Sequence, residues 1–198
     1  MESRDRTIPP YECFDLDPLP YKLVVIPIRA DVDHPEDLVR TLTERIDAKL
    51  VQVVDAQWVV GAKHLRAAVV ETLLGDISGS TWIENPSLRL LAYLSLERQL
   101  VEAIAKTGVK RGSQVRLVLC AVVQDESAAN EVLSAVATSK IACVDPSGFR
   151  EMEPEAIDKV AERFEIRLDI LGEVPAEERV GALTDILIER MALLPYRS

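Results

Sequence analysis

The sequence contains few aromatic residues and few of the side chains that bind metals or form disulfides. Phe, Trp and Tyr make up 5 % of the 198 residues, so a core has to be built from Val, Leu, Ile and Ala. The three cysteines, Cys13, Cys120 and Cys143, lie far apart without a CxxC pair, which favours reduced thiols. The two histidines, His34 and His64, have no second ligand at i+4. We therefore expect no metal site and no cofactor.

Long hydrophobic runs and an excess of positive charge are absent as well. No stretch reaches the roughly 18 consecutive apolar residues that a membrane-spanning helix needs, so no contact with a membrane is expected. The opening residues MESRDRTIPPYE mix charges with prolines, unlike a signal peptide, which favours a cytoplasmic location. The formal net charge of −10 repels nucleic acid on average. Binding to RNA would therefore require a local basic patch.

The distribution of apolar residues predicts a mixed α/β single domain, in which a small β-sheet packs with several helices, one of them central and apolar. Residues 1–20 hold four prolines and little apolar periodicity, so we expect a poorly ordered extension before a domain at residues 21–198. Strands are expected at residues 21–29, 50–56, 114–123 and 140–145. Pro27 favours an edge or a strand end for the first, and the run at 114–123 is typical of an interior strand. Helices are expected at residues 34–46, 59–74, 85–108, 126–139, 154–164 and 176–194, with a loop at 75–84.

The central helix is predicted from the stretch NPSLRLLAYLSLERQLVEAIAKTGV, which begins at Asn85. Asn85 and Pro86 supply an N-cap and a first-turn proline, and leucines then cover nearly every direction of the helix. Arg98, Glu102 and Lys106 follow at i,i+4 spacing. Such a line is either a solvated charge ladder or part of a binding surface.

Two further helices have apolar residues on more than one side. The helix at 59–74 carries two opposite stripes, which predicts a position between two partners, with Lys63, His64 and Arg66 at the seams. In the helix at 176–194, Ile186, Ile188 and Leu193 lie outside the main apolar stripe. That helix is either fully buried or carries a protein interface.

The sequence contains no recognisable catalytic set. Cys143 and Asp145 stand two apart without a nearby histidine, and the segment VDPSG is typical of a turn. Asp55 follows a strand, where a helix N-cap is the simpler interpretation. We therefore expect a protein that is not an enzyme.

Two motifs, one in residues 51–70 and one in the central-helix stretch from Asn85 to Gly108, resemble those of a known family, the small tRNA-binding and kinase-binding subunit of the KEOPS complex (the p53-related protein kinase-binding protein family). The first is VQVVDAQWVVGAKHLRAAVV, with an Asp-Ala pair followed by Gly-x-x-His-Leu. The second is the central-helix stretch, in which the following residues stand at the family's positions: Asn85, Leu91, Tyr93, Ser95, Arg98, Gln99, Ala103, Ile104 and Gly108. The closing IERMALL is similar to the C-terminal helix of archaeal members, whereas Arg89 departs from an acidic preference near its position.

This resemblance implies a subunit without catalytic activity of its own. It would bind the small atypical protein kinase of the complex and recruit tRNA, through the 3′ CCA end, for threonylcarbamoyl-adenosine formation at position 37. A single-stranded end is read by stacking and a few cationic contacts, which an acidic protein can provide locally. The residues predicted to contact RNA are Lys63, His64, Arg66, Tyr93, Arg98, Gln99 and Lys106. Those predicted to contact the partner are Ile186, Ile188 and Leu193.

A different class of function remains open from the residues alone. A short sheet, a helix between two partners and a glycine-containing loop also suit a small-molecule-binding regulatory domain or a minor α/β enzyme.

Overall fold

Strands and helices are mixed up to residue 123, and helices dominate the described residues after it. The computed structural model describes residues 11–79, 81–150 and 152–196. The strands are β1 (Glu12–Asp15), β2 (Lys22–Val32), β3 (Leu50–Asp55), β4 (Gly112–Val123) and β5 (Cys143–Val144). The α-helices are α1 (Pro35–Thr43), α2 (Ala62–Ser78), α3 (Pro86–Ser95), α4 (Leu100–Thr107), α5 (Glu126–Thr138), α6 (Ile157–Arg163) and α7 (Arg179–Leu193). Short 3-10 turns are η1 (Ala56–Trp58), η2 (Pro154–Ala156), η3 (Leu168–Leu171), η4 (Ala176–Glu178) and η5 (Leu194–Tyr196).

The sheet is antiparallel, with β4 between two partners. The strand order is β1-β2-β4-β3, and β5 pairs with the far part of β2. β4 pairs with β2 through Cys120 and Val25, and with β3 through Leu119 and Val53. The prediction of an interior strand is confirmed, because residues 117–123 are buried. The mixed α/β class is confirmed too, and none of the described helices is long and apolar enough to cross a membrane.

Pro27 lies inside β2, which corrects the expectation of an edge or a strand end. β1 pairs with β2 at residues 22–25 and β5 pairs at residues 28–29, so Pro27 falls between two short partners. The Pro27 carbonyl accepts a hydrogen bond of 2.8 Å from the backbone N–H of Asp145, just beyond β5. Proline has no N–H to donate. At the unpaired position between β1 and β5, Pro27 therefore removes no hydrogen bond from the sheet.

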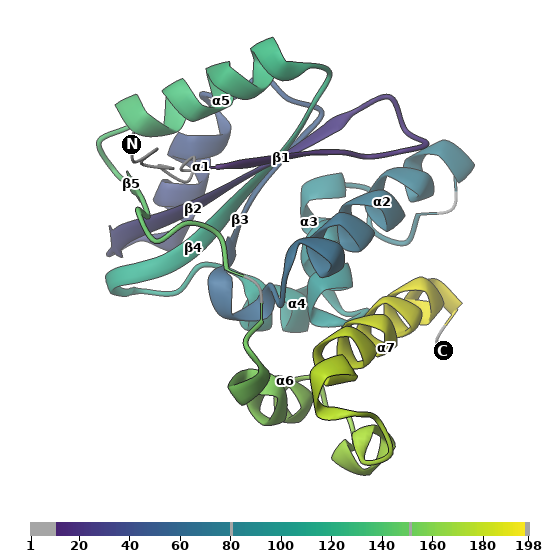
Figure 1. Ribbon diagram of the computed structural model, residues 1–198. Coiled ribbons are helices and arrows are strands. Elements are labelled where there is room, and N and C mark those ends of the chain that lie inside the picture. Colours follow the sequence, from purple (N-terminus) through teal and green to yellow (C-terminus); the bar gives the residue numbers. More distant parts are fainter. Residues whose placement is uncertain (1–10, 80, 151, 197–198) are drawn as a thin grey trace, which may run out of the picture.

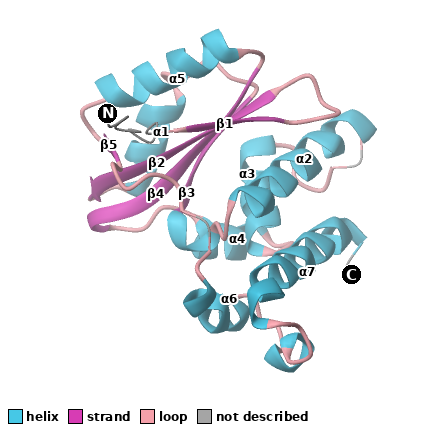
Figure 2. Cartoon of the chain, viewed as in Figure 1, coloured by secondary structure: helices cyan, strands magenta, loops and turns pink. Residues whose placement is uncertain are grey.

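Helices cover both faces of the sheet (Figure 1; Figure 2). Alternate residues of β2 point to opposite faces: Ile26 packs with α1 and α5, whereas Val25 packs with α2, α3 and α7. In the second layer α2 contacts both α3 and α7. The prediction that α2 is held between two partners is therefore confirmed.

The central helix α3 is buried on nearly every side, since Arg89–Ser95 are all buried. Asn85 caps it as predicted, accepting a hydrogen bond of 3.2 Å from the N–H of Leu88. Its first turn also covers the free edge of β3: the Ser87 hydroxyl donates to the Val51 carbonyl at 2.8 Å, and the Gln52 amide donates to the Ser87 carbonyl at 2.9 Å. These bonds leave that edge closed to another strand.

The helix expected at 85–108 is two helices, α3 and α4. Leu96 has a φ of 58°, in the left-handed region. The N–H of Leu96 donates to the carbonyl of Tyr93 and that of Glu97 to the carbonyl of Ala92, which is the Schellman pattern that ends a helix. Since a leucine holds the position that glycine usually takes, the sequence carries no signal of this break.

Two other boundaries differ from those expected from the sequence. Residues 12–15 form β1, and Leu16 and Leu19 are buried, so this part of the expected extension belongs to the domain. Residues 1–10 lie outside the described residues. α2 runs on to Ser78, into the segment expected to be a loop, and ends at Gly79, whose φ of 66° suits glycine.

Arg89 is a fully buried cation that ties three segments together. Its guanidinium donates to the carbonyls of Ile83 at 2.7 Å and Thr72 at 3.0 Å, and it forms an ion pair with Asp76. The end of α2 and the segment before α3 are thereby fastened to α3. A buried charge is tolerable only with such partners.

We predict that Arg89→Met destabilises the domain by about 3 kcal/mol, because the Ile83 and Thr72 carbonyls and the Asp76 carboxylate lose their donor. Urea unfolding followed by circular dichroism measures the change. The exposed Arg98 provides the matched control, and Arg98→Met should stay within about 0.5 kcal/mol of the wild type. Equal stability of both variants would contradict the account of Arg89.

Candidate functional site

Lys63 and Arg66, two of the predicted RNA contacts, lie on the outer side of α2 and already have protein partners. Lys63 forms an ion pair with Asp185 of α7. Arg66 donates a hydrogen bond of 2.9 Å to the carbonyl of Asp15 and lies over the ring of Phe14, with 5.7 Å from its Cζ to the ring centroid. An exposed ion pair contributes at most about 1 kcal/mol, so Lys63 can exchange Asp185 for another anion.

Arg98 and Gln99 lie at the break between α3 and α4. Both side chains are exposed, and neither forms a side-chain hydrogen bond or ion pair with the described residues. Val101, in the first turn of α4, is 76 % exposed beside them. The turn therefore presents a cation, an amide and an aliphatic side chain to solvent together.

Lys106 lies beside Trp58, together with a cation that the sequence pattern does not predict. The Lys106 Nζ is 6.0 Å from the ring centroid of Trp58, and the Cζ of Arg163 is 5.6 Å from it. Lys106 forms its ion pair with Glu97, so the expected ladder through Glu102 does not form. Arg163 comes from α6, far along the chain, and only the folded chain brings it to Trp58.

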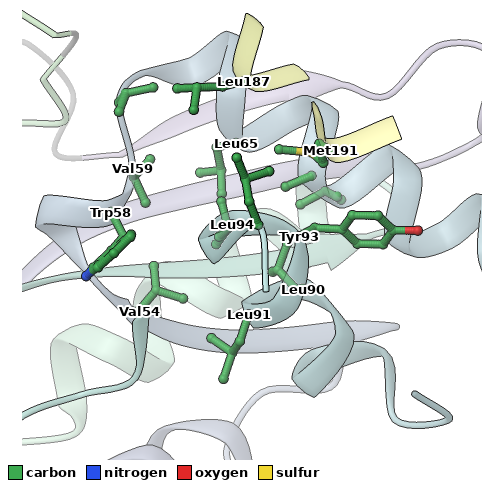
Figure 3. Packing of buried hydrophobic residues seen from close by; sticks show 14 of the residues in the cluster. Val54, Trp58, Val59, Leu65, Leu90, Leu91, Tyr93, Leu94, Leu187 and Met191 are labelled. Carbon is green, nitrogen blue, oxygen red and sulfur yellow. The ribbon is translucent and has the colours of Figure 1, made fainter. Parts of the chain in front are cut away.

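His64 and Tyr93 do not face solvent, which corrects their assignment to the RNA surface. The His64 side chain is 0 % exposed, and its ring meets that of Phe164 edge-on at 5.9 Å between centroids. Burial lowers the pKa of His64 to about 4. Tyr93 is 2 % exposed, and burial above all raises its pKa to about 12. Figure 3 shows Tyr93 beside Leu90 and Leu94, with its hydroxyl directed away from them. A nucleotide cannot reach either ring in this conformation.

The predicted partner residues on α7 differ in exposure. Ile186 packs against the core and Ile188 is half-buried, whereas Leu193 is 51 % exposed. Exposed apolar side chains also occur near the C-terminal ends of α2 and α7, which pack together. We call Leu193 and these additional residues, which are Leu74, Ile77 and Tyr196, the α2–α7 apolar surface. Ile77 was missed because it fell in the segment expected to be a loop.

The acidic residues considered for catalysis have structural partners. Asp55 caps η1, as the sequence predicts, by accepting a hydrogen bond from the N–H of Gln57. Asp145 is almost fully buried in a turn and contacts Ser147, Arg29 and Arg116. Burial raises the pKa of Asp145, but the Ser147 and Arg29 bonds outweigh burial and lower the pKa to about 2. Across residues 11–79, 81–150 and 152–196, no group of three His, Cys, Asp or Glu is placed to hold a metal ion.

The geometry therefore offers binding surfaces: an apolar one at the ends of α2 and α7, and basic groups around α4. A family model described as Kinase binding protein CGI-121 matches residues 30–195. The chain belongs to this family. No curated protein matches the chain.

Membership in the Kinase binding protein CGI-121 family makes a protein kinase the expected partner. The matched residues contain the sheet from β3 to β5, all seven helices of the described residues and three members of the α2–α7 apolar surface. The fourth, Tyr196, follows the match directly. Apart from Tyr196, both candidate surfaces thus lie on the part of the chain that matches the family.

The burial of His64 generates a prediction about pH. Both ring nitrogens lack hydrogen-bond partners in the described part of the chain, and the folded pKa of about 4 lies below the ordinary value of 6.5. Between pH 6.5 and 4, His64 is therefore protonated in the unfolded chain but stays neutral in the folded chain. The free energy of unfolding should fall by roughly 3 kcal/mol as the pH drops through this range. His64→Leu should remove that slope in urea unfolding curves.

The exposed His34 supplies the control for this experiment. His34→Leu should retain the loss of stability between pH 6.5 and 4. If both variants retained it, other groups would be its source and His64 would not be buried as a neutral ring.

Proposed function

We propose that this chain is a non-catalytic subunit of a KEOPS complex of the archaeal type, acting in the cytoplasm. In this role it binds the small atypical kinase subunit and recruits tRNA through the 3′ CCA end for threonylcarbamoyl-adenosine formation at position 37. The observation that carries the proposal is the match to a kinase-binding family over residues 30–195, joined to the motif from Asn85 to Gly108. The absence of a recognisable catalytic set in the sequence agrees with a binding role.

The kinase is assigned to the α2–α7 apolar surface. Leu193 is 51 % exposed and Tyr196 is 84 % exposed, and with Leu74 and Ile77 they form a group of exposed large side chains, which is typical of an interaction surface. Glu189 is exposed one helical turn before Leu193, so a charged side chain neighbours the apolar one, as at the rim of many protein interfaces. Ile188 is half-buried at the margin of this surface, and Ile186 supports it from the core.

We predict that Leu193→Glu weakens kinase binding at least tenfold while the domain stays folded, because a carboxylate would have to lose its water in the centre of the contact. Isothermal titration with the purified kinase measures the affinity, and circular dichroism checks the fold. Val101→Glu is the matched control, since Val101 is an aliphatic residue that is even more exposed, on α4. Full kinase affinity of Leu193→Glu would move the kinase to another surface.

RNA binding is assigned to the side chains around α4. Arg98 and Gln99 are free of side-chain partners among the described residues, and Lys106 lies beside Trp58 and Arg163. Two or three cations beside the exposed side chain of Val101 suit a short single strand, which needs a few phosphate contacts. Trp58 is buried and offers no open ring face to a base in this conformation. Lys63 and Arg66, on α2, would contact a more distant part of the tRNA.

We predict that Arg98→Ala weakens tRNA binding roughly tenfold, the loss expected for one charged hydrogen bond, without changing stability. The salt dependence should also become shallower by about 0.7 in log K against log salt, the value for one phosphate contact of a single strand. Filter binding across a salt series measures both. Arg45→Ala, an exposed arginine after α1, is the control and should bind like the wild type.

A tRNA that lacks its CCA end separates this assignment from general attraction to phosphates. The wild type should bind the shortened tRNA at least as weakly as Arg98→Ala binds the intact one, because the other contacts to the 3′ end are lost as well. Equal affinity of the wild type for both tRNAs would show that the 3′ end is not the part recognised.

A further inference from the structure

A cavity of about 520 Å³ lies between the sheet and α6, apart from the α2–α7 apolar surface. Pro27 of β2 and Val118 of β4 line it from the sheet, and Val160 of α6 lines it from the helix. Phe149 and Met152, from the segment between β5 and α6, complete an apolar wall. The volume falls in the range of sites that hold a small organic ligand.

The two buried carboxylates of this cavity are already satisfied by protein donors. Asp55 accepts from Gln57 at both oxygens, from the backbone N–H at 3.1 Å and from the side-chain amide at 2.7 Å. One oxygen of Asp145 accepts from the N–H and hydroxyl of Ser147, at 3.0 and 2.7 Å. The other lies 3.0 Å from the Nε of Arg29 and 3.4 Å from the Nε of Arg116. Neither carboxylate therefore needs a cation from a ligand.

By contrast, the cationic side chains that line the cavity have N–H donors that remain unused. Arg150 and Lys159 are exposed and make no ion pair or hydrogen bond with the described residues. Arg116 contacts Asp145 through Nε, so its two Nη groups remain available. Arg163 donates to the Gln57 carbonyl through one Nη and keeps the other. In a chain of net charge −10, these unfilled donors surround one concave site, which is the arrangement that an anion requires.

We propose that this cavity binds a nucleoside monophosphate, with the phosphate at Arg116, Arg150 and Lys159 and the base against the apolar wall. Several cations along the wall of one cavity suit a doubly charged phosphate, and arginine forks match its oxygens in geometry. Phe149 is half-buried and offers an aromatic face to a flat base. Glu153, also at the cavity, is exposed and has no cation partner in the described chain, so it weakens the binding of an anion there.

A phosphate with its attached base can come from two sources, a free mononucleotide or a nucleotide within a nucleic acid. AMP and a short mixed-sequence oligoribonucleotide are therefore the two probes, followed by isothermal titration and by backbone NMR shifts of the full chain. Both probes should perturb Phe149, Lys159 and Arg163. An oligonucleotide that binds more tightly than AMP marks nucleic acid as the source, whereas AMP binding as tightly or more tightly marks the free nucleotide.

Charge variants test whether Arg150 and Lys159 bind the phosphate. Lys159→Glu and Arg150→Glu should each weaken AMP binding at least tenfold, and Glu153→Gln should tighten it a few-fold. Arg45→Glu makes the same charge change on the opposite face of the sheet and should leave AMP affinity unchanged. All four positions are exposed, so the variants should fold like the wild type.

Three results would overturn the proposal. They are the absence of saturable binding of either probe at millimolar concentration, adenosine binding as tightly as AMP, and AMP affinity unchanged in Lys159→Glu and Arg150→Glu. Arg163 borders both this cavity and the basic region around α4, but Leu193 and Arg98 lie outside the cavity. Leu193→Glu and Arg98→Ala therefore test kinase and tRNA binding separately from Lys159→Glu and Arg150→Glu, so a failure here is told apart from a failure there.

Discussion

The burial of α3 on nearly all sides is the constraint on which the rest of the structure depends. Seven consecutive residues, Arg89–Ser95, are buried, so α3 has to meet the sheet, α2 and α4 together. Its polar groups must then find partners inside the protein. Ser87 and Gln52 close the edge of β3, Ser95 donates to the carbonyl of Leu91 at 2.8 Å, and Arg89 reaches Asp76 and two carbonyls. The polar side chains of Ser87, Arg89 and Ser95 therefore serve mainly to make the burial of α3 possible.

That arrangement also determines which surfaces are free for partners. With α3 inside, α2 and α7 become the outer helices of the second layer, held to each other by Leu65, Leu187 and Met191 (Figure 3). The core ends before the helices do, so apolar side chains at their C-terminal ends project into solvent. On the other side of α3, the Leu96 turn brings Arg98 and Gln99 out of the core. An apolar surface and a basic region thus lie on different edges of the same layer.

Much of the fold follows from local sequence signals. Most of the features that the sequence-based prediction located wrongly depend on long-range contacts. The apolar run of β4, the Asn85 cap and the Asp55 cap are local patterns, and the structure has all three as predicted. The break at Leu96 lacks the glycine that would have signalled it. His64 looked like a seam residue by helical spacing, but Phe164, from a distant segment, covers its ring. The approach of Arg163 to Trp58 likewise depends on tertiary packing that periodicity does not encode.

We propose that the family's kinase partner covers the ends of α2 and α7. Hydrogen exchange of the amides, measured by mass spectrometry with and without the kinase, tests it most directly, because slower exchange on binding marks the contact. The account predicts slower exchange at residues 71–79 and 186–196 in the complex. Protection confined to α1 and α5, on the opposite face of the sheet, would contradict it.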